Sequence, residues 1–168
     1  MVAVRGSHLL NPQDFVIEQW CAGLKLAEQT EKSLIDAWYY ARDLMSTHPD
    51  EMKNATLMLQ SGVEMVEILH ELNMDAETLL TAMLFPIVAN KLIDWESLKE
   101  KFGAKITKLL KGVLEMDNIR QLNASHSANA LQVDNVRRML LAMVDDFRCV
   151  IIKLAEQIGR ASCRERVY

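Results

Sequence analysis

Residues 104–116, AKITKLLKGVLEM, decide the fold of this chain. The apolar residues of this stretch recur at positions i, i+3, i+4 and i+7, the spacing of one face of an α-helix. They are Ile106, Leu109, Leu110, Val113 and Met116. No run of the sequence alternates apolar and polar residues for long, and only six glycines and three prolines interrupt its 168 residues. The sequence therefore predicts an all-α fold, a single bundle of about eight helices.

The same periodicity and the usual helix end signals predict the other seven helices. Their expected ranges are about 12–21, 32–44, 54–72, 76–89, 95–102, 136–147 and 150–158. Asn11-Pro12 is expected to begin the first helix, because proline fits the first helical position after a capping residue. Asp75 and Asp94 are expected to cap the fourth and fifth helices. Gly103 is expected to end the fifth helix in the left-handed conformation.

Apolar residues at helical spacing also predict which face of each helix is buried. The expected inward residues are Leu34, Ile35, Trp38 and Ala41 in the second helix; Leu57, Met58, Val63, Val66 and Leu69 in the third; Val136, Met139, Leu140, Met143 and Phe147 in the seventh; and Val150, Ile151, Leu154 and Ile158 in the eighth. Two segments are expected outside regular structure, namely His48-Pro49 and the small polar run NASHSANA at residues 123–130.

The composition is that of a globular protein without a basic surface. Hydrophobic residues make up 50% of the chain and charged residues 25%, with a net charge of −4. Because phosphate binding needs clustered lysine and arginine, this balance argues against a nucleic-acid-binding domain. The three cysteines, Cys21, Cys149 and Cys163, are widely spaced and predict incidental thiols in a reducing compartment. The sequence shows no signal peptide and no apolar run near the roughly 20 residues of a membrane span, so we expect a cytoplasmic protein.

The end of the chain differs from the rest in pattern. Residues 159–168, GRASCRERVY, drop the apolar period and place three arginines around Cys163. We interpret residues 159–168 as a vector-derived tail and residues 1–158 as the domain. A short native basic tail is the alternative interpretation.

Residue types alone indicate no active site. The four histidines are scattered, and none lies three or four residues from another histidine or a cysteine, as metal-binding pairs on helices do. They are His8, His48, His70 and His126. We interpret His70 as a solvated helix residue and place His126 in the polar loop. The sequence contains no glycine-rich phosphate loop of the GxxxxGK[ST] or GxGxxG type.

Three aspartates near the C-terminal helices are candidates for acid–base chemistry, because paired carboxylates can exchange protons with a substrate. They are Asp134, Asp145 and Asp146. Nothing in the sequence indicates a raised pKa for them. We therefore expect these carboxylates to form surface ion pairs with neighbouring arginines, the candidates being Arg137, Arg138 and Arg148.

Three segments resemble one known family in the same order along the chain. They are GVEMVEIL at residues 62–69, LLTAMLFP at residues 79–86, and VDNVRRMLLAMVDDFRCVIIKLAEQI at residues 133–158. The family is the RelA/SpoT homologues, and the segments are similar to its HD-type hydrolase domain. In the bifunctional members, the resemblance implies, this domain removes the 3′-pyrophosphate of (p)ppGpp with a divalent metal, expected to be manganese, held by two histidines and two aspartates.

The chain departs from the family's metal motif throughout. The HP dipeptide becomes Ser61-Gly62, LHD becomes Leu84-Phe85-Pro86, a glutamate–aspartate pair becomes Ala89-Asn90, and KLAD ends in Glu156. Phe85 has no lone pair to give a metal, and the hydroxyl of Ser61 is a poor ligand for a divalent ion. Pro86 lacks both the carboxylate and a backbone N–H, so it should also kink the fourth helix. The resemblance therefore implies a degenerate site at Ser61, Phe85, Pro86, Ala89, Asn90 and Glu156, with no catalytic residue, metal or cofactor.

The resemblance implies a regulatory pseudo-hydrolase domain at the N-terminus of a longer (p)ppGpp synthetase. Such a parent, a GTP pyrophosphokinase, moves pyrophosphate from ATP to GTP or GDP in the stringent response. The expected partners are the synthetase domain of the same chain and, through later domains, the ribosome, with no membrane and no direct nucleic acid; a homo-oligomer stays open. Two alternatives remain: a (p)ppGpp 3′-pyrophosphohydrolase using Glu156 with Asp145 or Asp146, and a helical interaction module.

Overall fold

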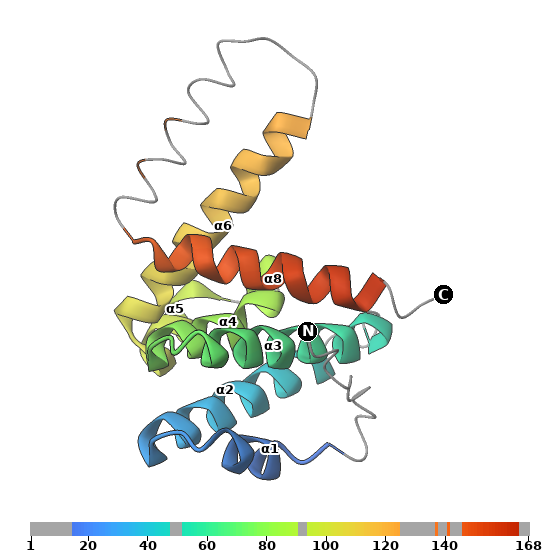
Figure 1. Cartoon of the computed structure of the whole chain (residues 1–168), viewed down its shortest axis with the longest axis vertical. Helices are drawn as coiled ribbons and strands as arrows, with labels where there is room; N and C mark the ends of the chain where they lie inside the picture. The colour runs from blue at the N-terminus through green and yellow to red at the C-terminus, as the bar shows by residue number, and fades with distance from the viewer. Residues whose placement is uncertain are drawn as a thin grey trace.

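The computed structural model describes residues 15–47, 52–90, 94–124, 137, 141 and 146–164, with only the backbone described for 52–55, 117–124 and 161–164. Every regular element in these ranges is an α-helix, which confirms the all-α fold. The helices are α1 (Ile17–Leu24), α2 (Glu28–Ser46), α3 (Met52–Glu71), α4 (Ala76–Ala89), α5 (Trp95–Phe102), α6 (Ala104–Ala124) and α8 (Arg148–Arg164). They pack into one bundle in which α3 and α4 lie side by side between α2 and α8, and α6 crosses behind α8 (Figure 1).

Helix α4 is the centre of the bundle. It packs against α2, α3, α6 and α8, so other helices surround it on several sides. Every residue from Thr78 to Val88 is buried. The sequence explains this position, because LLTAMLFPIV carries no charge and is apolar around the whole helix rather than on one stripe. The predicted range of this helix, residues 76–89, is confirmed.

The predicted inner face of α6 is also confirmed. Its five apolar residues, from Ile106 to Met116, are each less than a tenth exposed. Gly112 lies on the same helix where α6 meets α8. A Cβ atom placed on Gly112 would lie 2.7 Å from the Cys149 Sγ atom, so the two helices approach closely here because this residue has no side chain.

Several predicted helix ends were wrong. Phe15 and Val16 are not helical, and α1 begins only at Ile17, while Asn11-Pro12 lies outside the described residues. The predicted loop at 123–130 is wrong at its first two residues, since α6 continues through Ala124; the remainder of that loop and His48-Pro49 lie outside the described residues. Asn123 and Ala124 continue α6 because both residues can adopt helical dihedral angles once the apolar face before them has formed the helix.

The predicted helix ends at aspartate and glycine are confirmed in part. Asp94 caps α5, because its carboxylate accepts hydrogen bonds from the backbone N–H groups of Glu96 and Ser97. Asp75 occupies the N-cap position of α4, but its carboxylate accepts from the Thr78 hydroxyl instead of a backbone N–H. Gly103 has φ +88° and ψ 167°, so it is not in the left-handed helical conformation, although its positive φ still favours glycine.

The predicted inward face of α8 was wrong at two of its four residues, whereas Val150 and Ile151 are half-buried and pack against the core. Leu154 and Ile158 are 51% and 56% exposed, whereas Cys149, Ile152 and Ala155 are buried. Both faces of this helix carry apolar residues, so periodicity alone could not choose between them. The buried face also includes two charged residues, Lys153 and Glu156, which a sequence pattern assigns to solvent.

Two other predicted inward residues are exposed. Leu57 on α3 is 53% exposed, although Val63, Val66 and Leu69 on the same helix are buried as predicted. Phe147 was predicted inside the seventh helix, but it lies in the turn before α8 and is 62% exposed. Most of the predicted seventh helix lies outside the described residues.

Candidate functional site

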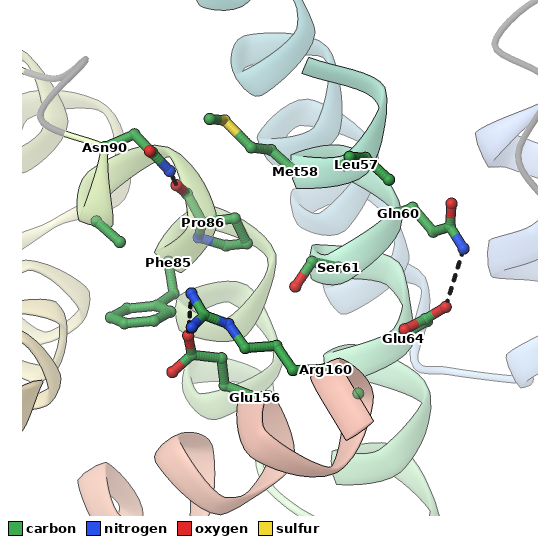
Figure 2. A pocket seen from close by; sticks show the side chains of 12 residues that line it. Leu57, Met58, Gln60, Ser61, Glu64, Phe85, Pro86, Asn90, Glu156 and Arg160 are labelled. Atoms are coloured by element: carbon green, nitrogen blue, oxygen red, sulfur yellow. Dashed lines mark hydrogen bonds and ion pairs between the residues drawn. The ribbon is translucent and has the colours of Figure 1, made fainter. Parts of the chain in front are cut away.

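A pocket of about 310 Å³ lies between α3, α4 and α8 (Figure 2). All six positions that the sequence singled out line this pocket, although they lie up to 95 residues apart in the sequence (156 − 61 = 95). The other lining residues are Leu57, Met58, Gln60, Glu64, Gly159 and Arg160. The structure thus brings the predicted positions together in one place. Their assignment to the family's hydrolase site stays a prediction.

Helix α3 supplies the polar wall of the pocket. Ser61 projects from α3 toward α4, and Glu64 lies one turn further along the same helix (Figure 2). The Gln60 side-chain amide donates a hydrogen bond of 3.1 Å to the Glu64 carboxylate. Gly62, which follows Ser61, allows α4 to approach α3 closely because it has no side chain. A Cβ atom on Gly62 would lie 3.0 Å from the Met83 carbonyl oxygen. Sequence reasoning missed Gln60 and Glu64, whose i, i+4 spacing was the available signal.

Helix α4 supplies the apolar wall. Phe85 is 1% exposed and Pro86 is also buried. Neither side chain carries an oxygen, nitrogen or sulfur atom that could bind a metal. The helix continues through Pro86 to Ala89, even though proline cannot donate the backbone hydrogen bond of an interior helical residue. Asn90 follows, and its side-chain amide donates a 2.7 Å hydrogen bond to the Pro86 carbonyl oxygen. Asn90 therefore provides a hydrogen-bond donor for one of the last carbonyl groups of α4, which lack partners within the helix.

Helix α8 supplies the charges. Glu156 is 5% exposed, and both of its carboxylate oxygens are engaged. Lys153, itself 6% exposed, donates from Nζ to Oε2 of Glu156, and Arg160 Nη2 lies 3.1 Å from Oε1. The Lys153 Nζ atom also lies 5.0 Å from the centroid of the Phe85 ring, within the range of a cation–π interaction. Sequence reasoning missed Lys153, because a lysine at i−3 of a glutamate usually forms an exposed pair.

The donor set of this pocket does not fit a divalent transition metal. Such a site needs several imidazole, carboxylate or thiolate ligands converging on one point. The pocket offers one serine hydroxyl, the amide oxygens of Gln60 and Asn90, the paired Glu156 carboxylate and the Glu64 carboxylate on the opposite helix, and no imidazole or thiolate. Across residues 15–47, 52–90, 94–124 and 146–164, no group of three or more His, Cys, Asp or Glu side chains could hold a metal ion.

Asp146 and Arg148 do not line the pocket. The expected ion pair of Asp146 is confirmed, since Arg148 Nη2 lies 2.7 Å from its carboxylate. This hydrogen-bonded guanidinium lowers the pKa of Asp146 below its ordinary value of 3.8. Arg148 also reaches Asp75 and Glu77 at the start of α4, at 2.8 and 3.1 Å. Asp134, Asp145, Arg138, His8, His48 and His126 lie outside the described residues.

Among the described side chains, Cys21, Cys149 and His70 form no metal-ligand cluster, and the two thiols are not activated as nucleophiles. Cys21 and Cys149 are buried free thiols, and burial raises their pKa to about 12 and about 11. They therefore stay protonated at neutral pH, as inert core thiols do. His70 lies half-buried in the last turn of α3, so it is less solvated than predicted.

The chain belongs to the HD domain family, whose model matches residues 37–166 and so spans the helices that form the pocket. Within that family its resemblance to the RelA/SpoT homologues is confirmed by relatives from two bacteria. The chain is 96% identical over 158 residues to the GTP pyrophosphokinase of Haemophilus influenzae, and 48% identical over 162 residues to that of Escherichia coli K12. These matches cover 94% and 95% of the chain but 21% of each relative.

A more distant relative carries a hydrolase name. The chain is 29% identical over 133 residues to the bifunctional (p)ppGpp synthase/hydrolase SpoT of Escherichia coli K12, a match over 79% of the chain and 18% of the relative. The chain therefore spans about a fifth of the length of the curated relatives it matches. Among the described residues, no helix has the length and apolar character to cross a membrane.

Proposed function

We propose that this chain is the regulatory, hydrolase-inactive HD domain of a (p)ppGpp synthetase, the N-terminal part of a GTP pyrophosphokinase. The observation that carries the proposal is the pocket between α3, α4 and α8. It gathers the six degenerate positions, yet Phe85 and Pro86 replace metal ligands by apolar groups and Glu156 is already paired. In an active hydrolase a bound metal would lower the pKa of a water molecule to make a nucleophile. Within the part of the chain that the structure describes, no set of ligands supports that step.

The rest of the proposal follows from the size of the relatives. Because the chain spans 21% of each GTP pyrophosphokinase, pyrophosphate transfer from ATP to GTP would belong to regions outside it. Its partner would be the synthetase region of the same polypeptide, restrained through helix contacts, and ribosome binding would belong to later regions. We also propose a cytoplasmic location, no bound cofactor, and no direct contact with nucleic acid.

The geometry does not favour a rearranged hydrolase site. Asp146 and Glu156 are ten residues apart along one helix and its preceding turn, which corresponds to about 15 Å. Asp146 is also held by Arg148, and Glu156 by Lys153. Two carboxylates so placed cannot bind the same ion, since metal–oxygen distances are roughly 2 Å.

The first test measures metal and hydrolysis directly. We expect the purified chain to retain no stoichiometric manganese after gel filtration and to release no pyrophosphate from ppGpp. Near-unit manganese occupancy would contradict the proposal. For the regulatory role, full-length Haemophilus influenzae GTP pyrophosphokinase is compared with a version lacking the matching region. A restrained synthetase should be faster without that region, and equal rates would argue for a structural role alone.

A second test restores the missing ligands. The double variant Phe85→His/Pro86→Asp supplies two ligands, and adding Ser61→His and Glu156→Asp completes the family's set. Because affinity depends on ligand number and geometry, the double variant should bind manganese weakly and the quadruple variant measurably more tightly. Hydrolysis should stay slow, because Ala89 and Asn90 provide no carboxylate to orient water. Equally tight binding by the double variant in calorimetry would show that the ligand positions are wrongly assigned.

A further inference from the structure

A buried cation already lies beside the pocket. The Lys153 side chain is 8% exposed, too little for its ammonium group to reach solvent as exposed lysines do. Removing an ammonium ion from water costs several kcal/mol unless an opposite charge and further contacts compensate. Lys153 has both, because its Nζ atom pairs with Glu156 and lies 5.0 Å from the centre of the Phe85 ring.

The three residues form one unit across two helices. Lys153 and Glu156 lie one turn apart on α8, and Phe85 lies on α4. The face of an aromatic ring carries negative charge density and attracts an ammonium ion, most strongly where water is excluded. Phe85 is 1% exposed, so the contact is dry. The carboxylate and the ring therefore hold the same positive charge from two sides.

We propose that the Lys153 ammonium is the resident cation of this site and takes the place a divalent ion would need. It neutralises Glu156 and joins α8 to α4 through the Phe85 ring. A divalent ion could bind Oε2 of Glu156 only by displacing this ammonium, and it would find an aromatic ring and a proline where further ligands are required. The α4–α8 contact should therefore be permanent and independent of metal, whatever the chain regulates.

Arg160 is not essential to this unit. Its guanidinium contacts the second oxygen of Glu156, but its side chain is 75% exposed. An exposed pair contributes little, because water screens it and the long side chain loses entropy. The variant Arg160→Ala should therefore leave the melting temperature almost unchanged. The proposal thus does not depend on residues 159–168, which we interpret from the sequence as a vector-derived tail.

A double-mutant cycle on the purified chain tests the pairing. We expect Lys153→Met and Glu156→Leu each to lower the melting temperature by roughly 6–20 °C, because each removes from a buried charge its buried partner of opposite sign. The double variant should melt higher than either single variant, since both charges are then gone. The matched control is the pair Lys32 and Glu28, 2.8 Å apart but 72% and 85% exposed.

The control variants Lys32→Met, Glu28→Leu and their combination should each change the melting temperature by less than about 4 °C and combine additively. Additive losses at Lys153 and Glu156, or losses as small as those of the control, would overturn the proposal.

A spectroscopic measurement on the unmutated chain covers the case in which a variant fails to fold. The Lys153 ammonium should exchange its protons slowly with water and give an observable ¹⁵N-resolved NMR signal, while the exposed Lys32 should give none. The Lys153 signal should be unaffected by EDTA and by excess manganese, and the variant Phe85→Leu should shift it, because ring-current effects are lost. Selective broadening of the Lys153 signal by manganese, or the absence of a protected signal, would overturn the proposal.

Discussion

Gly112 and Cys149 should show a change of sign in a double-mutant cycle. Gly112 lies in the interior of α6, where replacing glycine by alanine gains roughly 1 kcal/mol in helix propensity. In this bundle a Cβ atom on Gly112 would lie 2.7 Å from Cys149 Sγ, and Cys149 is 4% exposed. Overpacking of this kind costs roughly 1–3 kcal/mol, so Gly112→Ala should be neutral or destabilising by up to about 2 kcal/mol.

The variant Cys149→Ala removes the sulfur that the new methyl group would meet. In that background Gly112→Ala should stabilise the chain by up to roughly 1 kcal/mol, because the propensity gain remains and the steric cost disappears. Urea unfolding of the four proteins measures this coupling, provided that the m-values agree. Gly23→Ala is the control, since no atom lies within 4 Å of the position of its Cβ and its effect should be equal in both backgrounds. A stabilising Gly112→Ala in the presence of Cys149 would refute the described packing of α6 on α8.

Three further outcomes are expected. Because hydrogen bonding to Arg148 lowers the pKa of Asp146 from 3.8, the stability lost in Asp146→Asn should be constant above about pH 5 and should decrease as the pH falls from there through the lowered pKa; a difference that does not decrease on acidification would contradict this ion pair. On α8, Ile152→Ala should cost roughly 2–5 kcal/mol and Leu154→Ala less than about 0.5 kcal/mol, and comparable losses in urea unfolding would restore the predicted face. Cys149 should resist alkylation at pH 8 in the folded chain and react on unfolding, since burial raises its pKa to about 11.

The sequence predicts the interior of this bundle better than its ends. The uniformly apolar stretch of α4 and the single stripe of α6 each allow one arrangement, so range and burial follow directly. Helix α8 has apolar residues on two faces, and the choice depends on whether Lys153 and Glu156 can be buried. That depends on a ring contributed by α4, about 70 residues earlier in the sequence, and local periodicity contains no such information.

The pocket shows the same division. The six positions predicted to be degenerate could be found only through resemblance to a family, because most of them are residues such as serine, phenylalanine, proline and alanine, which form no chemical pattern of their own. Their meeting in one cavity depends on the packing of α3, α4 and α8. Gln60 and Glu64 were missed because a polar i, i+4 pair on a helix is usually solvent-facing. Residue types thus reveal a site that keeps its metal ligands or catalytic groups, but they reveal little of a site that has lost them.

The two ion-pair clusters on α8 have a mechanical consequence. Arg148 binds Asp75 and Glu77 at the start of α4, and Lys153 contacts Phe85 near the other end of that helix. The attachment points on α4 are ten residues apart from Asp75 to Phe85, or about 15 Å along the helix axis. A rod fastened at two separated points cannot swivel about its own axis without breaking one of them. We therefore expect α4 and α8 to move together as one rigid unit, so that a rotation of α8 is transmitted to α4 at the centre of the bundle.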